Sequence, residues 1–166
     1  FLDNKMSEPE EATSDSDSKK NRVERLDNRI YFYSEVSRSQ ILSLNKQIRT
    51  LNMVLTKNSL IFQNDPPNIY LHINSYGGSV FAGFAAVDYI KDSIVPVYSI
   101  VDGCAASAAT LMSIVARRRF MSENSFMLIH QLSSGLWGKY EEMKDDMKNS
   151  DILMKKIKGL YAEHTK

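Results

Sequence analysis

The chain has 166 residues, 43% of them hydrophobic, which supports one hydrophobic core of ordinary size and is short for two. Its formal net charge at pH 7 is +1, so its overall charge does not favour binding to nucleic acid or to an anionic membrane. A single cysteine excludes a disulfide framework, and no apolar run approaches the ~20 residues that cross a bilayer. We therefore expect one soluble intracellular domain, in the cytoplasm or in an organelle such as a plastid or mitochondrion.

The chain begins with a polar segment. Residues 1–20 are acidic and poor in aliphatic side chains, which predicts a mobile tail ahead of a folded domain over residues 21–166. Residues 30–33 then predict a strand. A helix is predicted from apolar residues that recur at spacings of three and four, namely Ile41, Leu44, Ile48, Leu51 and Leu55.

Strands and helices are predicted to alternate through the middle of the chain. The expected order is strand 69–74, helix 79–91, strand 95–101, helix 105–116 and strand 126–130. Such alternation is typical of stacked βα units, so we predict an α/β fold with a largely parallel sheet.

A long amphipathic helix is predicted over about residues 138–161. A seven-residue rhythm marks one face of it, formed by Tyr140, Met143, Met147, Ser150, Met154, Ile157 and Tyr161. From periodicity alone, packing of this face on the domain's own core is the preferred interpretation. The acidic residues between these positions are expected on the solvated face; they are Glu141, Glu142, Asp145, Asp146 and Asp151.

Two other features favour structural roles. The run Arg117-Arg118-Arg119 is expected to be a solvated connection between a helix and a strand, because a nucleic-acid site needs more basic area and aromatic partners. Cys104 is expected to be a buried, inert thiol.

Ser107 and His130 are the residues with the strongest claim to chemistry. A serine hydroxyl becomes a nucleophile when an imidazole within hydrogen-bond reach accepts its proton. Small residues surround Ser107, and the start of a helix leaves amide donors free for a developing oxyanion. Gly78, after the 69–74 strand, offers another exposed amide. These residues predict nucleophilic hydrolysis.

Three segments together resemble the proteolytic subunit of the ATP-dependent Clp protease: residues 69–80, 103–107 and 127–131. The resemblance runs from about Arg25 to Lys166. It implies a crotonase-like Clp-protease fold with a protruding handle, at about residues 132–163, made of the long helix and a strand containing Leu136 and Trp137.

The same resemblance implies roles for individual residues. Ser107 would be the nucleophile, His130 the general base, and the amides of Gly78 and Ala108 the oxyanion donors. Tyr70 and His72 would lie in a pocket that receives a hydrophobic loop of a hexameric AAA+ ATPase. The third catalytic residue of the family, an acid that orients the histidine, would follow Lys166.

The implied function is a serine endopeptidase that degrades unfolded polypeptides inside a tetradecamer of two heptameric rings. It would need no metal or organic cofactor of its own. Two alternatives stay open: a non-catalytic Clp-like subunit of a mixed ring, and a crotonase-type acyl-CoA enzyme. The pairing of Ser107 with His130 weighs against the second.

Overall fold

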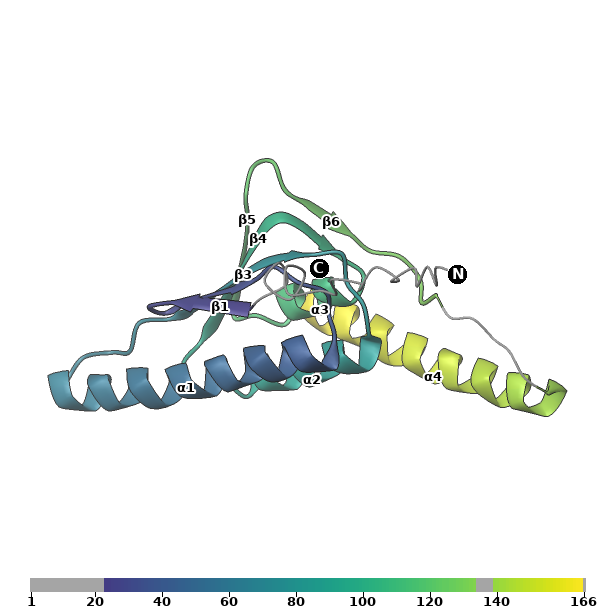
Figure 1. The fold of residues 1–166 in the computed structure, drawn as a ribbon, viewed down its shortest axis with the longest axis horizontal. Coiled ribbons are helices and arrows are strands. Elements are labelled where there is room, and N and C mark those ends of the chain that lie inside the picture. Colours follow the sequence, from purple (N-terminus) through teal and green to yellow (C-terminus); the bar gives the residue numbers. More distant parts are fainter. Residues whose placement is uncertain (1–22, 134–138, 166) are drawn as a thin grey trace, which may run out of the picture.

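The computed structural model describes residues 23–133 and 139–165 of the chain. The predicted tail over residues 1–20, and Leu136 and Trp137 of the predicted handle strand, lie outside the described residues. Within them the strands are β1 (Val23–Leu26), β2 (Arg29–Phe32), β3 (Ile69–Ser75), β4 (Val97–Ala106), β5 (Arg118–Met121) and β6 (Phe126–Leu128). The helices are α1 (Arg38–Phe62), α2 (Val80–Lys91), α3 (Ala108–Ile114) and α4 (Tyr140–His164) (Figure 1).

The strands form one sheet in the order β1-β2-β3-β4-β5, and β6 also pairs with β4. β1 and β2 are antiparallel, whereas the pairings of β3, β4, β5 and β6 are parallel. The prediction of an α/β fold with a largely parallel sheet is therefore confirmed. β5 and β6 pair with successive parts of β4, so β4 extends beyond the level of β5 to the residues before Ser107.

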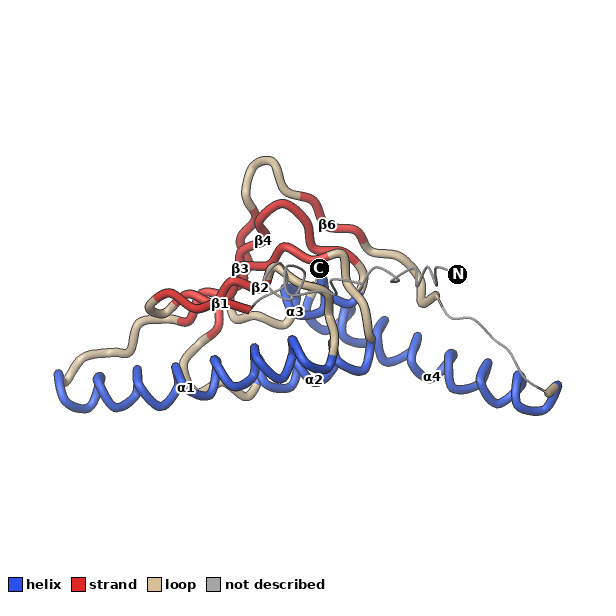
Figure 2. The backbone as a smooth tube through the Cα atoms, in the orientation of Figure 1, coloured by secondary structure: helices blue, strands red, loops and turns tan. Residues whose placement is uncertain are grey.

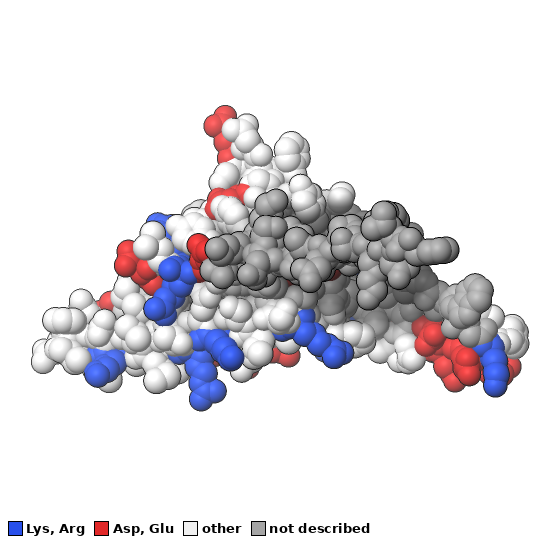
Figure 3. All heavy atoms as spheres, in the orientation of Figure 1, with Lys and Arg blue, Asp and Glu red and all other residues white. Residues whose placement is uncertain are grey.

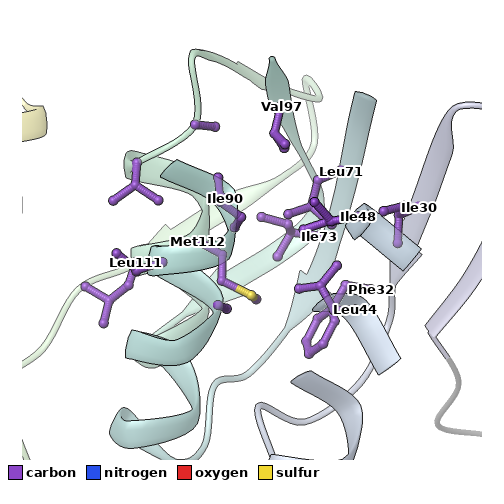
Figure 4. Close-up of a cluster of buried hydrophobic side chains, with 14 of the residues drawn as sticks. Ile30, Phe32, Leu44, Ile48, Leu71, Ile73, Ile90, Val97, Leu111 and Met112 are labelled. Atoms are coloured by element: carbon purple, nitrogen blue, oxygen red, sulfur yellow. The ribbon is translucent and has the colours of Figure 1, made fainter. Parts of the chain in front are cut away.

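One face of the sheet and the helices beside it enclose the core (Figure 2). Alternate residues of β3 point into it, and Ile69, Leu71 and Ile73 are fully buried. The five apolar residues predicted to line one face of the first helix are all buried in α1, as expected. Figure 4 shows side chains of the sheet meeting those of α1, α2 and α3 in this core.

The residues between these buried positions lie on the opposite face of the sheet. Tyr70 and His72 of β3 are half-buried there, beside Tyr98 and Ile100 of β4. The alternation of Tyr70 and His72 on one side of a strand is thus as the sequence predicts. This face carries aromatic and polar side chains instead of a second aliphatic layer.

Two predicted element boundaries and one predicted connection are wrong. Residues 105–106 continue β4 instead of starting a helix, because both pair with β6 and Ala105 also pairs with Ser75 of β3. β6 ends at Leu128, so His130 follows the strand instead of ending it. Arg118 and Arg119 belong to β5 and not to a connection, since they pair with β4. β1 was not predicted at all.

The long helix α4 runs away from the rest of the domain (Figure 1). Its C-terminal half packs on the core through partly buried apolar residues, namely Leu153, Ile157, Leu160 and Tyr161. Its N-terminal half is open to solvent, with Tyr140 67% and Met147 59% exposed. The predicted apolar face therefore packs on its own domain over only half of its length. Among the described residues, no helix is both long and apolar enough to span a membrane.

The predicted solvated face of α4 is confirmed. All five of its acidic residues named from the sequence are exposed. Acidic side chains gather at the far end of the helix in Figure 3. They support the helix locally: Glu142 accepts a hydrogen bond from the backbone amide of Lys139, one residue before the first turn.

Candidate active site

Ser107 lies at the junction between β4 and α3, in a backbone conformation that few side chains adopt. Its φ is 53° and its ψ is −127°. The backbone amide of Ser107 donates to the carbonyl of Leu128 at 2.9 Å, which ties the junction to the end of β6. Its hydroxyl makes no capping bond to α3. A strained backbone held by its surroundings, with a hydroxyl that is not used for capping, is typical of a functional position.

The Gly77–Gly78 loop packs against this junction. A Cβ built on Gly77, whose φ is +97°, would lie 2.7 Å from the Cβ of Ser107 and 2.8 Å from the carbonyl oxygen of Ala106. Only glycine allows this approach. The loop is held from its other side, where the amide of Val36 donates to the carbonyl of Gly77 at 2.8 Å. Gly78, the next residue, lines the same cavity as Ser107 and Ala108.

The four residues proposed from the sequence for catalysis line one cavity of about 190 Å³. Gly78 follows β3, Ser107 and Ala108 lie at the start of α3, and His130 follows β6, so they come from three different segments of the chain. The remaining wall is formed by Val80, Leu111, Gln131, Leu132, Ser133, Ile157 and Tyr161. The structure thus brings the sequence-predicted residues together, and adds α4 as a wall of the same cavity.

His130 is exposed, and its Nδ1 lies 2.7 Å from the carbonyl oxygen of Gln131. A carbonyl oxygen only accepts hydrogen bonds, so Nδ1 must be the donor. In the neutral imidazole, Nε2 then has a free lone pair that can accept a proton. A neighbouring backbone carbonyl therefore orients the imidazole, a function that an acid performs in many serine hydrolases.

Within the described part of the chain, no carboxylate contacts His130. All six acidic residues of α4, including Glu163, are exposed. A carbonyl oxygen fixes the tautomer of an imidazole but carries no full charge, so it supports the imidazolium less well than a carboxylate does.

Sequence reasoning missed Thr110 and the place of Tyr161. Thr110, fully buried in α3, donates from its Oγ1 to the carbonyl of Ser107 at 2.5 Å, and the Tyr161 hydroxyl is hydrogen-bonded to the same Oγ1. Burial raises the pKa of Tyr161 above its ordinary value, against a lowering contribution from the bond to Thr110. The seven-residue rhythm placed Tyr161 on the apolar face of the long helix, but no sequence signal linked it to Ser107.

The predicted docking residues lie on the other face of the sheet, in a polar and aromatic cluster. His72 contacts Asp102 through Nδ1 at 2.5 Å and Arg29 through Nε2 at 2.9 Å. The Arg29 guanidinium also lies 4.7 Å from the centre of the Tyr70 ring. Tyr33 donates to Asp102, and its pKa is raised by burial first and then by the charge of Asp102. Asp102 was not predicted to take part.

Cys104 is half-buried in β4, not fully buried as the sequence suggested. Its strand neighbour is Phe126 of β6, and it does not line the cavity of Ser107.

The fold and this cavity define an α/β protein with a serine and a histidine at one site, and comparisons with known proteins identify its family. The family model described as Clp protease matches residues 24–166. A ClpP1 mutant from Listeria monocytogenes has a similar structure, with a TM-score of 0.69, 26% sequence identity, and coverage of 83% of this chain and 72% of that chain. The chain belongs to the Clp protease family.

Two curated relatives are similar in sequence, and both are named ATP-dependent Clp protease proteolytic subunit 2. The one from Treponema denticola is 42% identical over 99 residues, which cover 58% of this chain and 50% of that protein. The one from Treponema pallidum is 36% identical over 99 residues, with the same two coverages. The match thus spans about half the length of these relatives.

Proposed function

We propose that this chain is the proteolytic subunit of a Clp-type serine endopeptidase that degrades unfolded polypeptides. The observation that carries the proposal is the single cavity shared by Ser107, His130, Gly78 and Ala108. The membership of the chain in the Clp protease family supports it. The family gives no support to the crotonase-type alternative.

In the proposed reaction, Ser107 Oγ attacks the carbonyl carbon of a peptide bond while His130 Nε2 accepts the hydroxyl proton. The amides of Gly78 and Ala108 stabilise the negative charge that develops on the carbonyl oxygen. The imidazolium then donates its proton to the leaving amine, and an acyl-enzyme forms. Water, deprotonated by the same imidazole, hydrolyses that ester and regenerates Ser107.

We further propose that copies of the chain assemble into two stacked heptameric rings. A groove of about 740 Å³ between α1 and α2 supports self-association. Among the residues that line it, Met53, Leu60 and Ile94 are 67%, 77% and 77% exposed. Apolar side chains gathered in this way are typical of a protein interface, and we assign the groove to a second copy of this chain. The open half of α4 is proposed as the contact between rings.

An AAA+ ATPase is the proposed partner that delivers substrate. Its hydrophobic loop would dock on the outer face of the sheet at Tyr70 and His72. The half-buried aromatic side chains of this face, Tyr70 and Tyr98, lie edge to face with ring centres 5.9 Å apart and offer an apolar surface to such a loop. Nothing in the proposed reaction calls on a metal or an organic cofactor of the subunit itself.

The test is covalent labelling with a fluorophosphonate, which reacts with activated serines. We expect one label per subunit in the wild type, none in Ser107→Ala and a strongly reduced rate in His130→Ala. Ser133→Ala is the matched control, because Ser133 lines the same cavity and has no proposed role, and it should label like the wild type. Equal labelling of Ser107→Ala and wild type would remove Ser107 from the role of nucleophile.

One observation favours a second candidate, the non-catalytic subunit of a mixed ring: within the described residues His130 has a carbonyl and no carboxylate as its partner. That candidate predicts a wild-type chain that takes up no label by itself but enters rings with an active Clp subunit. Native mass spectrometry of the co-expressed chains, with and without label, separates the two functions.

A further inference from the structure

A chain of hydrogen bonds leads from α4 to the backbone of Ser107. The carbonyl of Ser107 accepts from the Thr110 amide at 3.0 Å and from the Thr110 hydroxyl at 2.5 Å. Thr110 has one hydroxyl hydrogen, and that hydrogen is used on Ser107. The hydroxyl of Tyr161 must therefore be the donor in its bond to Thr110. Tyr161 therefore donates to Thr110, and Thr110 donates to Ser107.

These hydrogen bonds fix the orientation of the Ala108 amide as well as that of the Ser107 carbonyl. The carbonyl of Ser107 and the amide of Ala108 belong to the same peptide group, which is planar and trans, so the C=O and the N–H point in opposite directions. Ala108 is the first residue of α3, so its amide has no acceptor within the helix. Holding the Ser107 carbonyl on the Thr110 side therefore holds the Ala108 N–H in the opposite direction.

The peptide group needs such support because the backbone of Ser107 is strained. A φ of 53° with a ψ of −127° is unfavourable for a residue with a side chain. Rotation that relieved this strain would also turn the amide of Ala108. Two hydrogen bonds to the carbonyl, the second oriented by a hydroxyl on another helix, oppose that rotation.

We propose that Thr110 and Tyr161 are positioning residues that aim the Ala108 amide at the oxyanion of the reaction. The inference rests on the proposed function, because it assumes attack by Ser107. It adds that the packing of α4 on the domain directly affects the geometry of the catalytic site, since Tyr161 lies on α4 and lines the Ser107 cavity.

The experiment compares variants that delete one hydroxyl each. Thr110→Val keeps the shape of the side chain and removes its donor, Thr110→Ser keeps the donor, and Tyr161→Phe removes only the outer hydroxyl. Thr50→Val is the matched control, because it deletes a threonine hydroxyl that bonds to a helix carbonyl far from the cavity. The measurements are kcat and KM on a fluorogenic peptide, and the inhibition constant of a peptide aldehyde that forms a tetrahedral adduct.

Removing an oxyanion donor outright lowers kcat by about 10²–10³, so misdirecting one should lower kcat by about tenfold to a hundredfold in Thr110→Val, and by less in Tyr161→Phe. We expect KM to stay within about twofold, since substrate binding in the ground state does not need the oxyanion contact. The aldehyde should bind more weakly by a similar factor. Thr110→Ser should retain most of kcat, and Thr50→Val should match the wild type.

The inference is overturned if Thr110→Val and Tyr161→Phe keep kcat within about twofold of wild type, or if Thr110→Ser loses as much as Thr110→Val, which would indicate packing alone. Tyr161→Phe keeps the test valid if Thr110→Val fails to fold. Failure of the proposed function has a different signature, namely equal labelling of Ser107→Ala and wild type. Loss of labelling in Ser107→Ala with unchanged kcat in Tyr161→Phe and Thr110→Val would reject this inference alone.

Discussion

His72 and Asp102 are joined across two neighbouring strands, with Nδ1 of the imidazole 2.5 Å from a carboxylate oxygen. The other ring nitrogen lies 2.9 Å from Arg29, whose guanidinium can only donate. Nε2 of His72 is therefore the acceptor, and Nδ1 carries the proton that is donated to Asp102. Arg29 thus donates to His72, and His72 donates to Asp102, on the sheet face proposed for docking.

Asp102→Ala should lower the free energy of unfolding by about 1–2 kcal/mol, because it leaves the half-buried Nδ1–H of His72 and the hydroxyl of Tyr33 without their acceptor. This expected loss is smaller than that for a fully buried charged hydrogen bond, because both side chains are partly solvated. Urea denaturation measures it. Ser122→Ala removes a single exposed bond to the same carboxylate and should cost about 0.5 kcal/mol or less. Equal losses in the two variants would contradict the importance of the His72 pair.

Gly77→Ala should disrupt the candidate active site. The new methyl group would lie 2.7 Å from the Cβ of Ser107, on a residue with φ of +97°, so the loop or the serine must move. We expect a loss of stability of about 1–3 kcal/mol and the loss of most fluorophosphonate labelling. Intact-mass labelling and thermal denaturation check both.

Gly159→Ala is the control for Gly77→Ala. Gly159 lies in α4, and a Cβ there would meet nothing within 4 Å. The substitution should raise stability by up to about 1 kcal/mol, because alanine has the higher helix propensity, and should leave labelling unchanged. Similar damage from both substitutions would mean that the close approach at Gly77 has no special importance.

The helices that form the core could be predicted because their burial follows a local period. The face of α1 that begins at Ile41 and Leu44 needs no information from distant residues. The start of α3 could not be predicted in this way. Ala105 and Ala106 favour a helix by composition, but pairing with β3 and β6 keeps them in β4, and that pairing depends on distant residues.

The candidate site shows the same division. Ser107, His130 and Gly78 could be proposed from residue type and order, since their chemistry is carried by single side chains and amides. Thr110 could not, because a threonine within an apolar helix has many structural explanations. Its significance depends on the direction of two hydrogen bonds, and one of them comes from Tyr161, 51 residues away. Arg118 was assigned to a connection because a run of three arginines was expected to be solvated. All residues of β5 are in fact exposed, so the strand leaves no burial pattern in the sequence.

Met147→Glu should change assembly without damaging the fold. Met147 is 59% exposed on the open half of α4, so the free energy of unfolding of the subunit should change by about 0.5 kcal/mol or less. A new charge at the proposed contact between rings should nevertheless separate the rings, which native mass spectrometry detects. Unchanged particle masses would exclude this face of α4 from the contact.

Ile157→Glu is the matched control on the same helix face. Ile157 is partly buried against the core and lines the Ser107 cavity, so a carboxylate there should destabilise the subunit itself by about 1–3 kcal/mol. Met154 is a less suitable site, because its sulfur contacts the amide of Leu132 within the same chain. Loss of rings in both variants, with loss of stability only in Ile157→Glu, is the expected pattern.

Alkaline pH should destabilise the fold partly through Tyr161. Burial raises the pKa of this phenol above its ordinary value of 10.0, so the folded chain keeps a proton that the unfolded chain releases. Since the unfolded state then binds fewer protons, the free energy of unfolding falls as pH rises from about 10 through the folded-state pKa. Below about pH 10 both states are protonated and this contribution is constant.

Tyr161→Phe removes that titration, so its free energy of unfolding should decline less steeply than that of the wild type between about pH 9 and pH 11. Tyr33→Phe should flatten the decline by a smaller amount, because the pKa of Tyr33 is also raised but its side chain is 41% exposed. Urea denaturation across this range measures the slopes, and the double variant should combine both effects since the two residues lie on opposite sides of the sheet. Parallel declines in all four proteins would show that neither phenol holds its proton more tightly in the folded chain. Activity gives an independent reading, because an ionised Tyr161 can no longer donate to Thr110: kcat of the wild type should fall on the alkaline side, whereas the lower kcat of Tyr161→Phe should stay level there.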